Sequence, residues 1–80
     1  MPEEQLFKTE EARPRAEIAD VLATAAEQLE DGTVVLGGGS ETREVEVPEN
    51  PRFEVELERL TDSETGEQRY ELEYEVRWTE

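Results

Sequence analysis

The chain has 80 residues, of which 23 are acidic and 8 basic, and its formal net charge is −15. A chain of this length forms at most one domain, which we assign to residues 1–80 with an ordered core at about 5–79, and its small interior leaves no room for an enclosed active-site cavity. The sequence contains neither cysteine nor histidine, which excludes disulfides, thiolate chemistry and the most common zinc ligand.

The first predicted elements are a short strand and a helix. Residues 5–10 (QLFKTE) are expected to form a strand, with either Leu6 or Phe7 facing inward. From residue 14 to residue 30 the apolar residues follow a helical period, with Pro14 in the first turn and Gly32 just past the end. The predicted core face of this helix holds Ile18, Val21, Leu22, Ala25 and Leu29, and the opposite face holds Glu17, Asp20, Thr24, Glu27 and Gln28.

After Gly32 the period drops to two, which predicts further strands. Residues 33–36 (TVVL) and 42–48 (TREVEVP) are joined by a predicted turn at residues 37–40 (GGGS). Residues 52–60 (RFEVELERL) and 70–78 (YELEYEVRW) form another pair around a turn at residues 61–67. The predicted fold is α+β, an antiparallel-rich sheet of about five strands in the order β-α-β-β-β-β with one helix packed on one face. The position of the first strand in the sheet stays open.

Two registers satisfy the alternation in the last pair of strands. A two-residue turn at Thr65 and Gly66 places Phe53 opposite Trp78, whereas a turn centred one residue earlier places Phe53 opposite Val76. Both registers put apolar side chains on one face and glutamates on the other, in rows at positions 54, 56 and 58 and at 71, 73 and 75. Like charges that face each other destabilise a sheet at low salt. We therefore expect stability to rise with salt concentration.

The acidic charge is spread along the chain and predicts an environment rich in salt. A net charge of −15 repels other copies of the chain and any polyanion. The Debye length falls to about 3 Å at 1 M salt, where this repulsion is screened. We therefore expect a halophilic protein with no nucleic-acid partner. The alternative is an acidic regulator that imitates nucleic acid and occupies a basic protein surface.

The N-terminal residues bear on the expected location. The first eight residues (MPEEQLFK) show no basic segment followed by an apolar run. No stretch approaches the ~20 apolar residues of a membrane span. We expect a cytoplasmic protein with no membrane partner.

The order of segments along the chain is characteristic. It comprises an N-terminal LFK-E segment, a helix of the R-EIADVLATAAEQLEDG kind, a V-L-GG segment, EVEVPE, and an amphipathic last strand that ends in Trp78. This order, from Leu6 to Trp78, resembles the amphi-Trp domain, a family found mainly in haloarchaea. The resemblance implies a small stand-alone domain of unknown function and supports the high-salt interpretation. It brings no catalytic residues with it.

The sequence offers little catalytic chemistry. The GGGS segment lacks the lysine and the following helix of a phosphate-binding loop. Glutamates on a flat sheet face rarely converge on one ion, which favours diffuse cation accumulation over a metal site. Carboxylate acid–base catalysis needs a group sheltered in a pocket. We therefore expect no enzyme activity, no catalytic residue, no bound metal and no cofactor.

The aromatic side chains form the candidate interaction surface. Phe53, Tyr70, Tyr74 and Trp78 share the parity of the predicted core, which favours packing over base stacking on single-stranded nucleic acid. One helix is ~10–12 Å wide, whereas five strands at ~4.8 Å spacing span ~20 Å or more, so part of the apolar face is left uncovered. We expect a non-catalytic protein-interaction or structural module that binds an unknown protein partner or a second copy as a homodimer. Trp78 is expected to be partly buried.

Overall fold

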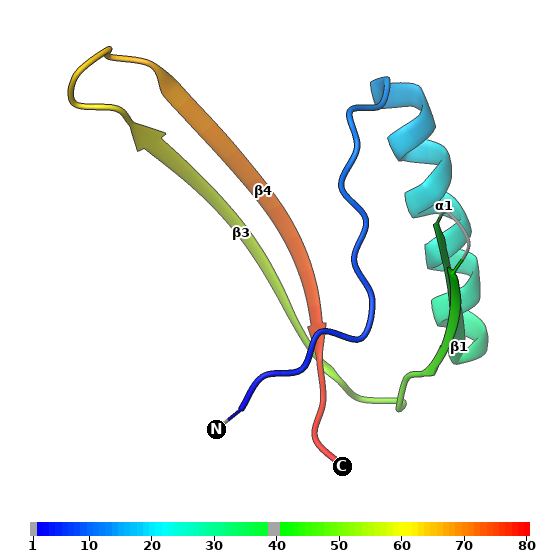
Figure 1. Cartoon of the computed structure of the whole chain (residues 1–80). Coiled ribbons are helices and arrows are strands. Elements are labelled where there is room, and N and C mark those ends of the chain that lie inside the picture. Colours follow the sequence, from blue (N-terminus) through cyan, green and yellow to red (C-terminus); the bar gives the residue numbers. More distant parts are fainter. Residues whose placement is uncertain (1, 39–40) are drawn as a thin grey trace. The chain divides into compact units, whose positions relative to one another are not determined.

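The computed structural model describes residues 2–38 and 41–80 (Figure 1). One helix and four strands follow each other along the chain: α1 (Arg15–Asp31), β1 (Thr33–Gly38), β2 (Glu41–Glu46), β3 (Arg52–Thr61) and β4 (Gln68–Arg77). The α+β class is therefore confirmed. The prediction of one sheet of about five strands is wrong, because β1 pairs with β2 and β3 pairs with β4 in two separate antiparallel sheets. Two residues of the predicted GGGS turn, 39 and 40, lie outside the described residues.

The chain divides into two compact units, Met1–Glu49 and Asn50–Glu80. The division falls in the segment PENP at residues 48–51, which belongs to neither sheet. Proline has no backbone N–H and cannot donate to a ladder. Pro48 and Pro51 therefore end the pairing of β2 on one side and delay the start of β3 on the other.

The helix α1 begins and ends close to the predicted residues. Pro14 occupies the N-cap position with φ −58°, and its carbonyl accepts hydrogen bonds from the N–H groups of Glu17 and Ile18 at 3.0 and 3.2 Å. At the other end Gly32 adopts φ 93°, a left-handed conformation that glycine takes without a steric penalty. Its N–H donates to the Leu29 carbonyl at 3.1 Å. Gly32 has the role that the sequence predicts, whereas Pro14 is the N-cap that precedes the helix and not a residue of its first turn.

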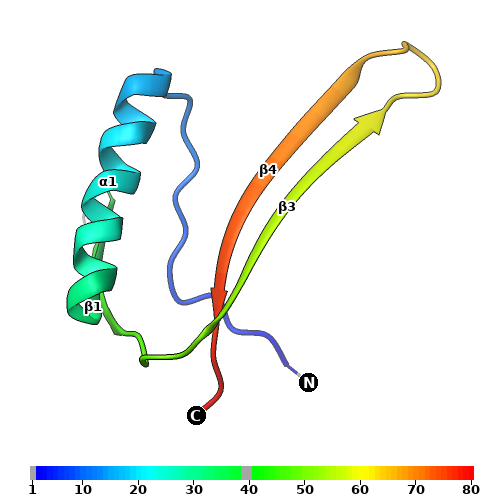
Figure 2. The ribbon, with the colours of Figure 1, turned by 180° about the vertical axis from the view of Figure 1, so that it is seen from behind.

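The helix packs along β1 (Figure 2), and the face it turns to the strand overlaps only in part with the predicted one. Val21 and Ala25 line a cavity beside β1, as expected for core residues. The same cavity is lined by Asp20, Thr24 and Gln28, so their assignment to the opposite face is wrong. The exposed fractions of four apolar residues assigned to the core remain high, at 46% for Ile18, 52% for Val21, 50% for Leu22 and 39% for Leu29.

A side-chain hydrogen bond accounts for this orientation of the helix. The Oε1 atom of Gln28 accepts a hydrogen bond from the backbone N–H of Val35 at 3.1 Å. The contact requires Gln28 to point toward β1, and residues one helical turn away follow it onto the same face. A polar residue is thus placed beside the strand because a backbone donor there needs an acceptor.

The prediction of a strand at residues 5–10 is also wrong. Residues 2–14 form neither helix nor strand. The segment lies against the end of β1 through side chains, since the Thr9 methyl group occupies the space that a side chain at Gly38 would need, with the Phe7 ring next to it. Phe7 also lines the cavity between α1 and β1, whereas Leu6 is 53% exposed. Of the two alternatives for the inward residue, the structure therefore favours Phe7.

The β3–β4 hairpin adopts the second of the two predicted registers, with Phe53 opposite Val76 and Val55 opposite Tyr74. The Asp62 N–H donates to the Glu67 carbonyl at 2.8 Å, which closes the loop one residue earlier than a Thr65–Gly66 turn would. The Asp62 carboxylate accepts hydrogen bonds from the N–H groups of Glu64 and Thr65 at 2.8 and 3.1 Å. Gly66 has φ 76° and donates its N–H to the Asp62 carbonyl at 2.9 Å. This local network selects the register.

Candidate functional site: the apolar face of the β3–β4 hairpin

The hairpin carries apolar and charged side chains on opposite faces. Residues two apart in a strand share a face, and the register aligns the faces of β3 and β4. The apolar face is defined by residues Phe53, Val55, Leu57, Tyr70, Leu72, Tyr74 and Val76. The acidic face is defined by residues Glu54, Glu56, Glu58, Glu71, Glu73 and Glu75.

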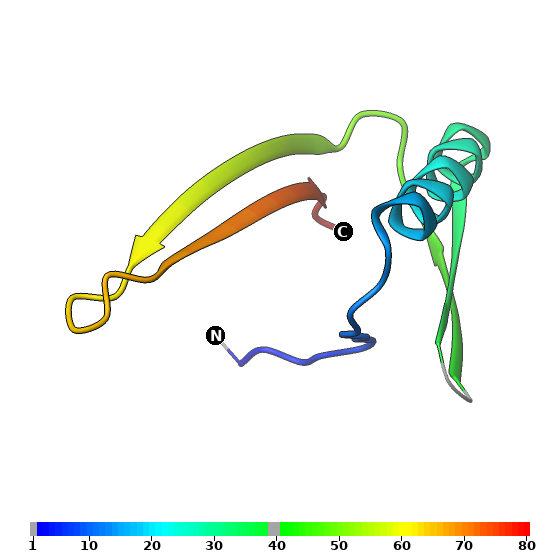
Figure 3. The same cartoon turned by 90° about the horizontal axis from the view of Figure 1, so that it is seen from above.

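Within the unit Asn50–Glu80 the apolar face is open to solvent. The exposed fraction of its side chains reaches 69% at Leu57, 64% at Phe53 and 58% at Tyr74. No side chain in residues 2–38 and 41–80 is fully buried. The unit Asn50–Glu80 contains only the two strands and their loop, which form a single curved layer (Figure 3). Nothing within this unit covers the apolar face.

The predicted aromatic residues lie along the whole apolar face. The rings of Phe53 and Tyr74 stack with centroids 6.4 Å apart and planes inclined by 15°, a diagonal pair across the two strands. Tyr70 lies toward the loop end, opposite Arg59, and its hydroxyl donates to Gln68 Oε1 at 3.1 Å. The structure thus brings Phe53 and Tyr74 into contact and places Tyr70 at a distance from them on the same face.

Trp78 follows the last residue of β4. Its parity is that of the apolar face, and 38% of its surface is exposed. This value puts Trp78 among the exposed large apolar side chains, and its burial at an interface stays a prediction. Packing of Trp78 on Phe53 stays a prediction.

The prediction of the candidate surface passed over its aliphatic residues. Leu57 has the largest exposed fraction of any apolar side chain on this face, and Leu72, directly opposite, is 59% exposed. Both share the parity of the aromatic residues. Parity alone does not tell whether a second layer covers them. Since this unit has no second layer, the two leucines belong to the candidate interaction surface.

The acidic face places carboxylates opposite carboxylates. Glu54 faces Glu75, Glu56 faces Glu73 and Glu58 faces Glu71. Arginines lie at the two ends of these rows: Arg77 is 3.1 Å from Glu75 and 4.0 Å from Glu54, and Arg69 is 3.6 Å from Glu71. The middle of the face is the most negative part, because these ion pairs involve only its ends.

This crowding changes the acidity of one carboxyl group. The Glu58 carboxylate, through a hydrogen bond and through charge repulsion, raises the pKa of Glu56 to about 7 from its ordinary value of 4.5. Desolvation and the charges of Glu54 and Glu73 contribute in the same direction. A proton on Glu56 therefore relieves part of the repulsion near neutral pH.

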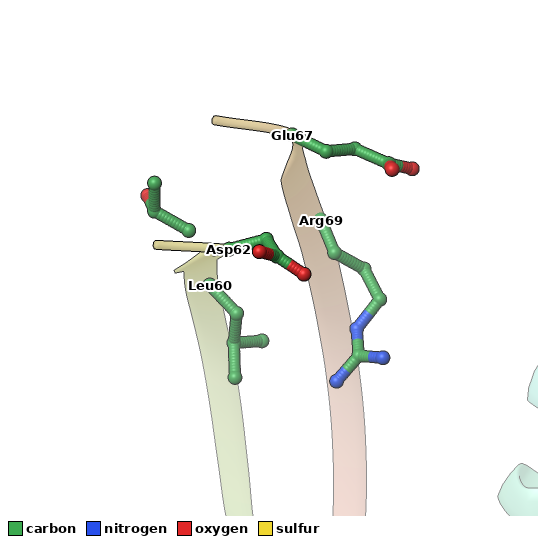
Figure 4. A pocket seen from close by; sticks show the side chains of 5 residues that line it. Leu60, Asp62, Glu67 and Arg69 are labelled. Atoms are coloured by element: carbon green, nitrogen blue, oxygen red, sulfur yellow. The ribbon is translucent and has the colours of Figure 1, made fainter. Parts of the chain in front are cut away.

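A shallow pocket of about 280 Å³ lies at the loop end of the hairpin (Figure 4). Its wall is formed by Leu60, Thr61, Asp62, Glu67 and Arg69. The Asp62 carboxylate is engaged with two backbone N–H groups, which lower its pKa, and Arg69 is paired with Glu71. The Asp62 carboxylate therefore serves to stabilise the turn.

The cavity beside β1 is larger, about 380 Å³. It lies within the unit Met1–Glu49 between α1, β1 and the segment that carries Phe7 and Thr9. Its best-defined polar group, Gln28, is already bonded to Val35. In the part of the chain that is described, no three carboxylates gather as a metal site would require, and no helix has the length and hydrophobicity to cross a membrane.

The fold and the exposed face define a small α+β protein built around an amphipathic hairpin. A family model for the Amphi-Trp domain matches residues 1–80, and the chain belongs to this family. No curated protein and no solved structure matches the chain.

Proposed function

We propose that this protein is a non-catalytic protein-interaction module of a high-salt cytoplasm, and that the apolar face of the β3–β4 hairpin is its binding surface. The observation that carries the proposal is the exposure of this face, on which six apolar side chains are between 53% and 69% exposed. A contiguous apolar patch of several hundred Å² is uncommon on a monomer and marks sites of interaction.

The stability of the hairpin supports the proposal. A two-stranded hairpin without a second layer is marginally stable in water. Strands β3 and β4 place all their apolar side chains except Leu60 on one side. An occupant on that side would stabilise the whole unit by burying them.

The chemistry of the face favours a protein as the occupant. Phe53, Tyr70 and Tyr74 are residue types enriched at the centres of protein interfaces. A net charge of −15 disfavours nucleic acid and anionic membrane surfaces. The two pockets described above are lined by other residues, which favours a broad partner on this face over a small molecule.

The acidic face supports adaptation to high salt. Its carboxylates face one another across the strands, an arrangement whose repulsion is screened when the Debye length falls to about 3 Å at 1 M salt. The same rows of glutamate motivate the alternative function, an acidic regulator that occupies a basic protein surface in place of nucleic acid.

Photo-cross-linking from the two faces tests the proposal. Benzoylphenylalanine replaces Leu57 on the apolar face or, as a matched control, Glu58 next to it on the acidic face, in the full chain produced in a high-salt cell. We expect irradiation to give adducts with protein from position 57 and few from position 58. Equal labelling from both positions, or none from position 57, would contradict the proposal. Adducts from position 58 alone, with proteins rich in lysine and arginine, would favour the acidic regulator.

A further inference from the structure

We infer that the occupant of the apolar face is a second copy of this chain, and that two hairpins pack face to face with their strands antiparallel. The inference rests on the proposed function, since it names the partner of the same surface. Area, charge distribution and the unequal ends of the face support it.

The exposed area matches that of a small specific interface. A fully accessible aromatic side chain presents roughly 150–250 Å², so six side chains at 53–69% exposure offer on the order of 600 Å² per copy. A face-to-face pair would bury on the order of 1,200 Å² in total, which is the lower end of the range of specific complexes. The face is thus large enough to hold two copies together without any other element.

Of the two faces of the hairpin, the charge distribution favours the apolar one for contact between like-charged copies. All six glutamates of the acidic face point away from the apolar face. Two sheets that pack face to face are ~10 Å apart, so the acidic faces would form the two outer surfaces of the pair. The remaining repulsion between copies is long-ranged and is screened by salt. A second copy of the chain is therefore sufficient to account for the separation of glutamates and apolar side chains on the two faces of the hairpin.

The two ends of the face are complementary to each other. The loop end carries Arg59, which lies on the apolar parity opposite Tyr70. The other end carries Phe53, with Trp78 just beyond β4. A two-fold axis across the strands at the Val55–Tyr74 pair exchanges these ends. Arg59 of each copy then lies at the level of Trp78 of the second copy, one strand to the side, within reach of a guanidinium that binds favourably to an aromatic ring.

Cysteine cross-linking tests the arrangement directly, because the natural chain has no cysteine. In about 2 M KCl, Val55→Cys copies should be joined by a bis-maleimide that spans ~10 Å, the distance between packed sheets. Glu54→Cys, adjacent on the acidic face, is the matched control and should not be joined. Arg59→Cys copies should not be joined either, because antiparallel packing puts these positions roughly 26 Å apart along the strands.

Light scattering on the same samples should give the mass of a dimer in about 2 M KCl and of a monomer in about 0.1 M KCl. Tyr74→Lys should raise the dissociation constant of the dimer by roughly 30-fold or more, as expected for an aromatic residue at the centre of an interface. Glu73→Lys, the neighbouring change on the acidic face, should leave dimerisation intact or strengthen it. Circular dichroism of both variants separates lost association from lost folding.

Three results would overturn the inference. A monomer in concentrated salt, with photo-adducts from position 57 on other proteins, would refute the second copy and leave the proposed function standing. Cross-links from Arg59→Cys would refute the antiparallel alignment. Joining of Glu54→Cys copies as fast as Val55→Cys copies would refute packing through the apolar face.

Discussion

The side chain of Gln28 occupies the open edge of β1, where its Oε1 atom accepts a hydrogen bond from the N–H of Val35 at 3.1 Å. The N–H of Val47 donates to the Gly32 carbonyl at 2.8 Å. Bonded and unbonded pairs alternate in an antiparallel ladder, so the N–H of Val35 points away from β2. The helix thus supplies the acceptor that a neighbouring strand would otherwise provide, and this blocks one site on an exposed edge.

Replacing Gln28 with methionine should weaken the first unit. Methionine keeps the length and the helix propensity of glutamine, but it leaves the N–H of Val35 without this acceptor. We expect a loss of about 0.5–1.5 kcal/mol in the free energy of unfolding and faster hydrogen exchange at Val35. Glu27→Met is the control on the neighbouring helical position. Unchanged exchange at Val35 in Gln28→Met would show that the hydrogen bond does not protect the edge.

Replacing Asp62 with alanine should destabilise the hairpin by about 1–2 kcal/mol, because two backbone N–H groups in the loop lose their acceptor. Glu64→Ala removes a side chain from the same loop and should have little effect. The pKa of Asp62 is lowered by these bonds. Its contribution to stability is therefore present above the ordinary value of 3.8 and is lost as pH falls through the lowered pKa. An acid unfolding curve that is the same in the wild type and in Asp62→Ala would contradict this assignment.

Glu56 should give the hairpin the opposite pH dependence near neutrality. Its pKa is raised to about 7 from 4.5, so the protonated form is favoured in the folded hairpin. The stabilisation from this group is complete below pH 4.5 and is lost as pH rises through about 7. We expect the thermal midpoint to be higher at pH 5 than at pH 8, at constant salt. Glu58→Gln removes the largest cause of the shift and should flatten the profile in this window.

Carbon-detected NMR of the glutamate carboxyl groups checks the same point at the level of the residue. The Glu56 resonance should titrate near pH 7 in the wild type and closer to 4.5 in Glu58→Gln. Titration of Glu56 at its ordinary pKa in the wild type would remove the basis of the prediction.

Monovalent salt should stabilise the fold. The acidic face pairs glutamate with glutamate at three positions, and these side chains are accessible to the screening ions. We expect the thermal midpoint to rise between about 0.1 and 2 M KCl. Replacing Glu56 and Glu73 with glutamine should reduce the slope, and replacing Glu3 and Glu4 should reduce it less. A midpoint that stays flat or falls over this range would contradict the account.

Trp78→Ala should weaken association by about 2 kcal/mol or more if the residue lies at the rim of the interface. The chain has one tryptophan, so its fluorescence in the wild type reports directly on this position. The emission should shift to shorter wavelength as protein concentration rises in high salt. If Trp78 only supports its own hairpin, the variant should instead lose stability as a monomer while its tendency to associate stays the same. Denaturant unfolding and light scattering on one sample separate these outcomes.

The sequence predicts the regular elements well where the period is sustained. The bounds of α1 and of all four strands agree with the prediction within two residues at each end. Alternation over ten residues, as in β3 and β4, specifies both the strand and its faces. That is why Phe53, Tyr70 and Tyr74 were correctly assigned to one face.

Features that depend on single hydrogen bonds were not predictable from the pattern. Residues 5–10 are too few for their alternation to specify a partner strand. The acceptor beside β1 is the side chain of Gln28, a polar residue that the helical pattern places on the face opposite the predicted core. The hairpin register depends on the Asp62 carboxylate, and composition alone fits both turns. The exposure of Leu57 was missed because alternation tells which residues share a face and not whether a second layer covers it.

The order of the contacting elements has a consequence for how the chain folds. In each unit the elements that pair follow one another directly: α1 with β1, β1 with β2, and β3 with β4. Proteins dominated by such short-range contacts fold in microseconds to milliseconds, because little chain entropy is lost before each contact forms. All the elements that pair in the first unit, α1, β1 and β2, are therefore synthesised before the second unit. During translation at ~5–20 residues per second, each hairpin has ample time to form as it emerges, since hairpin closure takes ~1–10 μs.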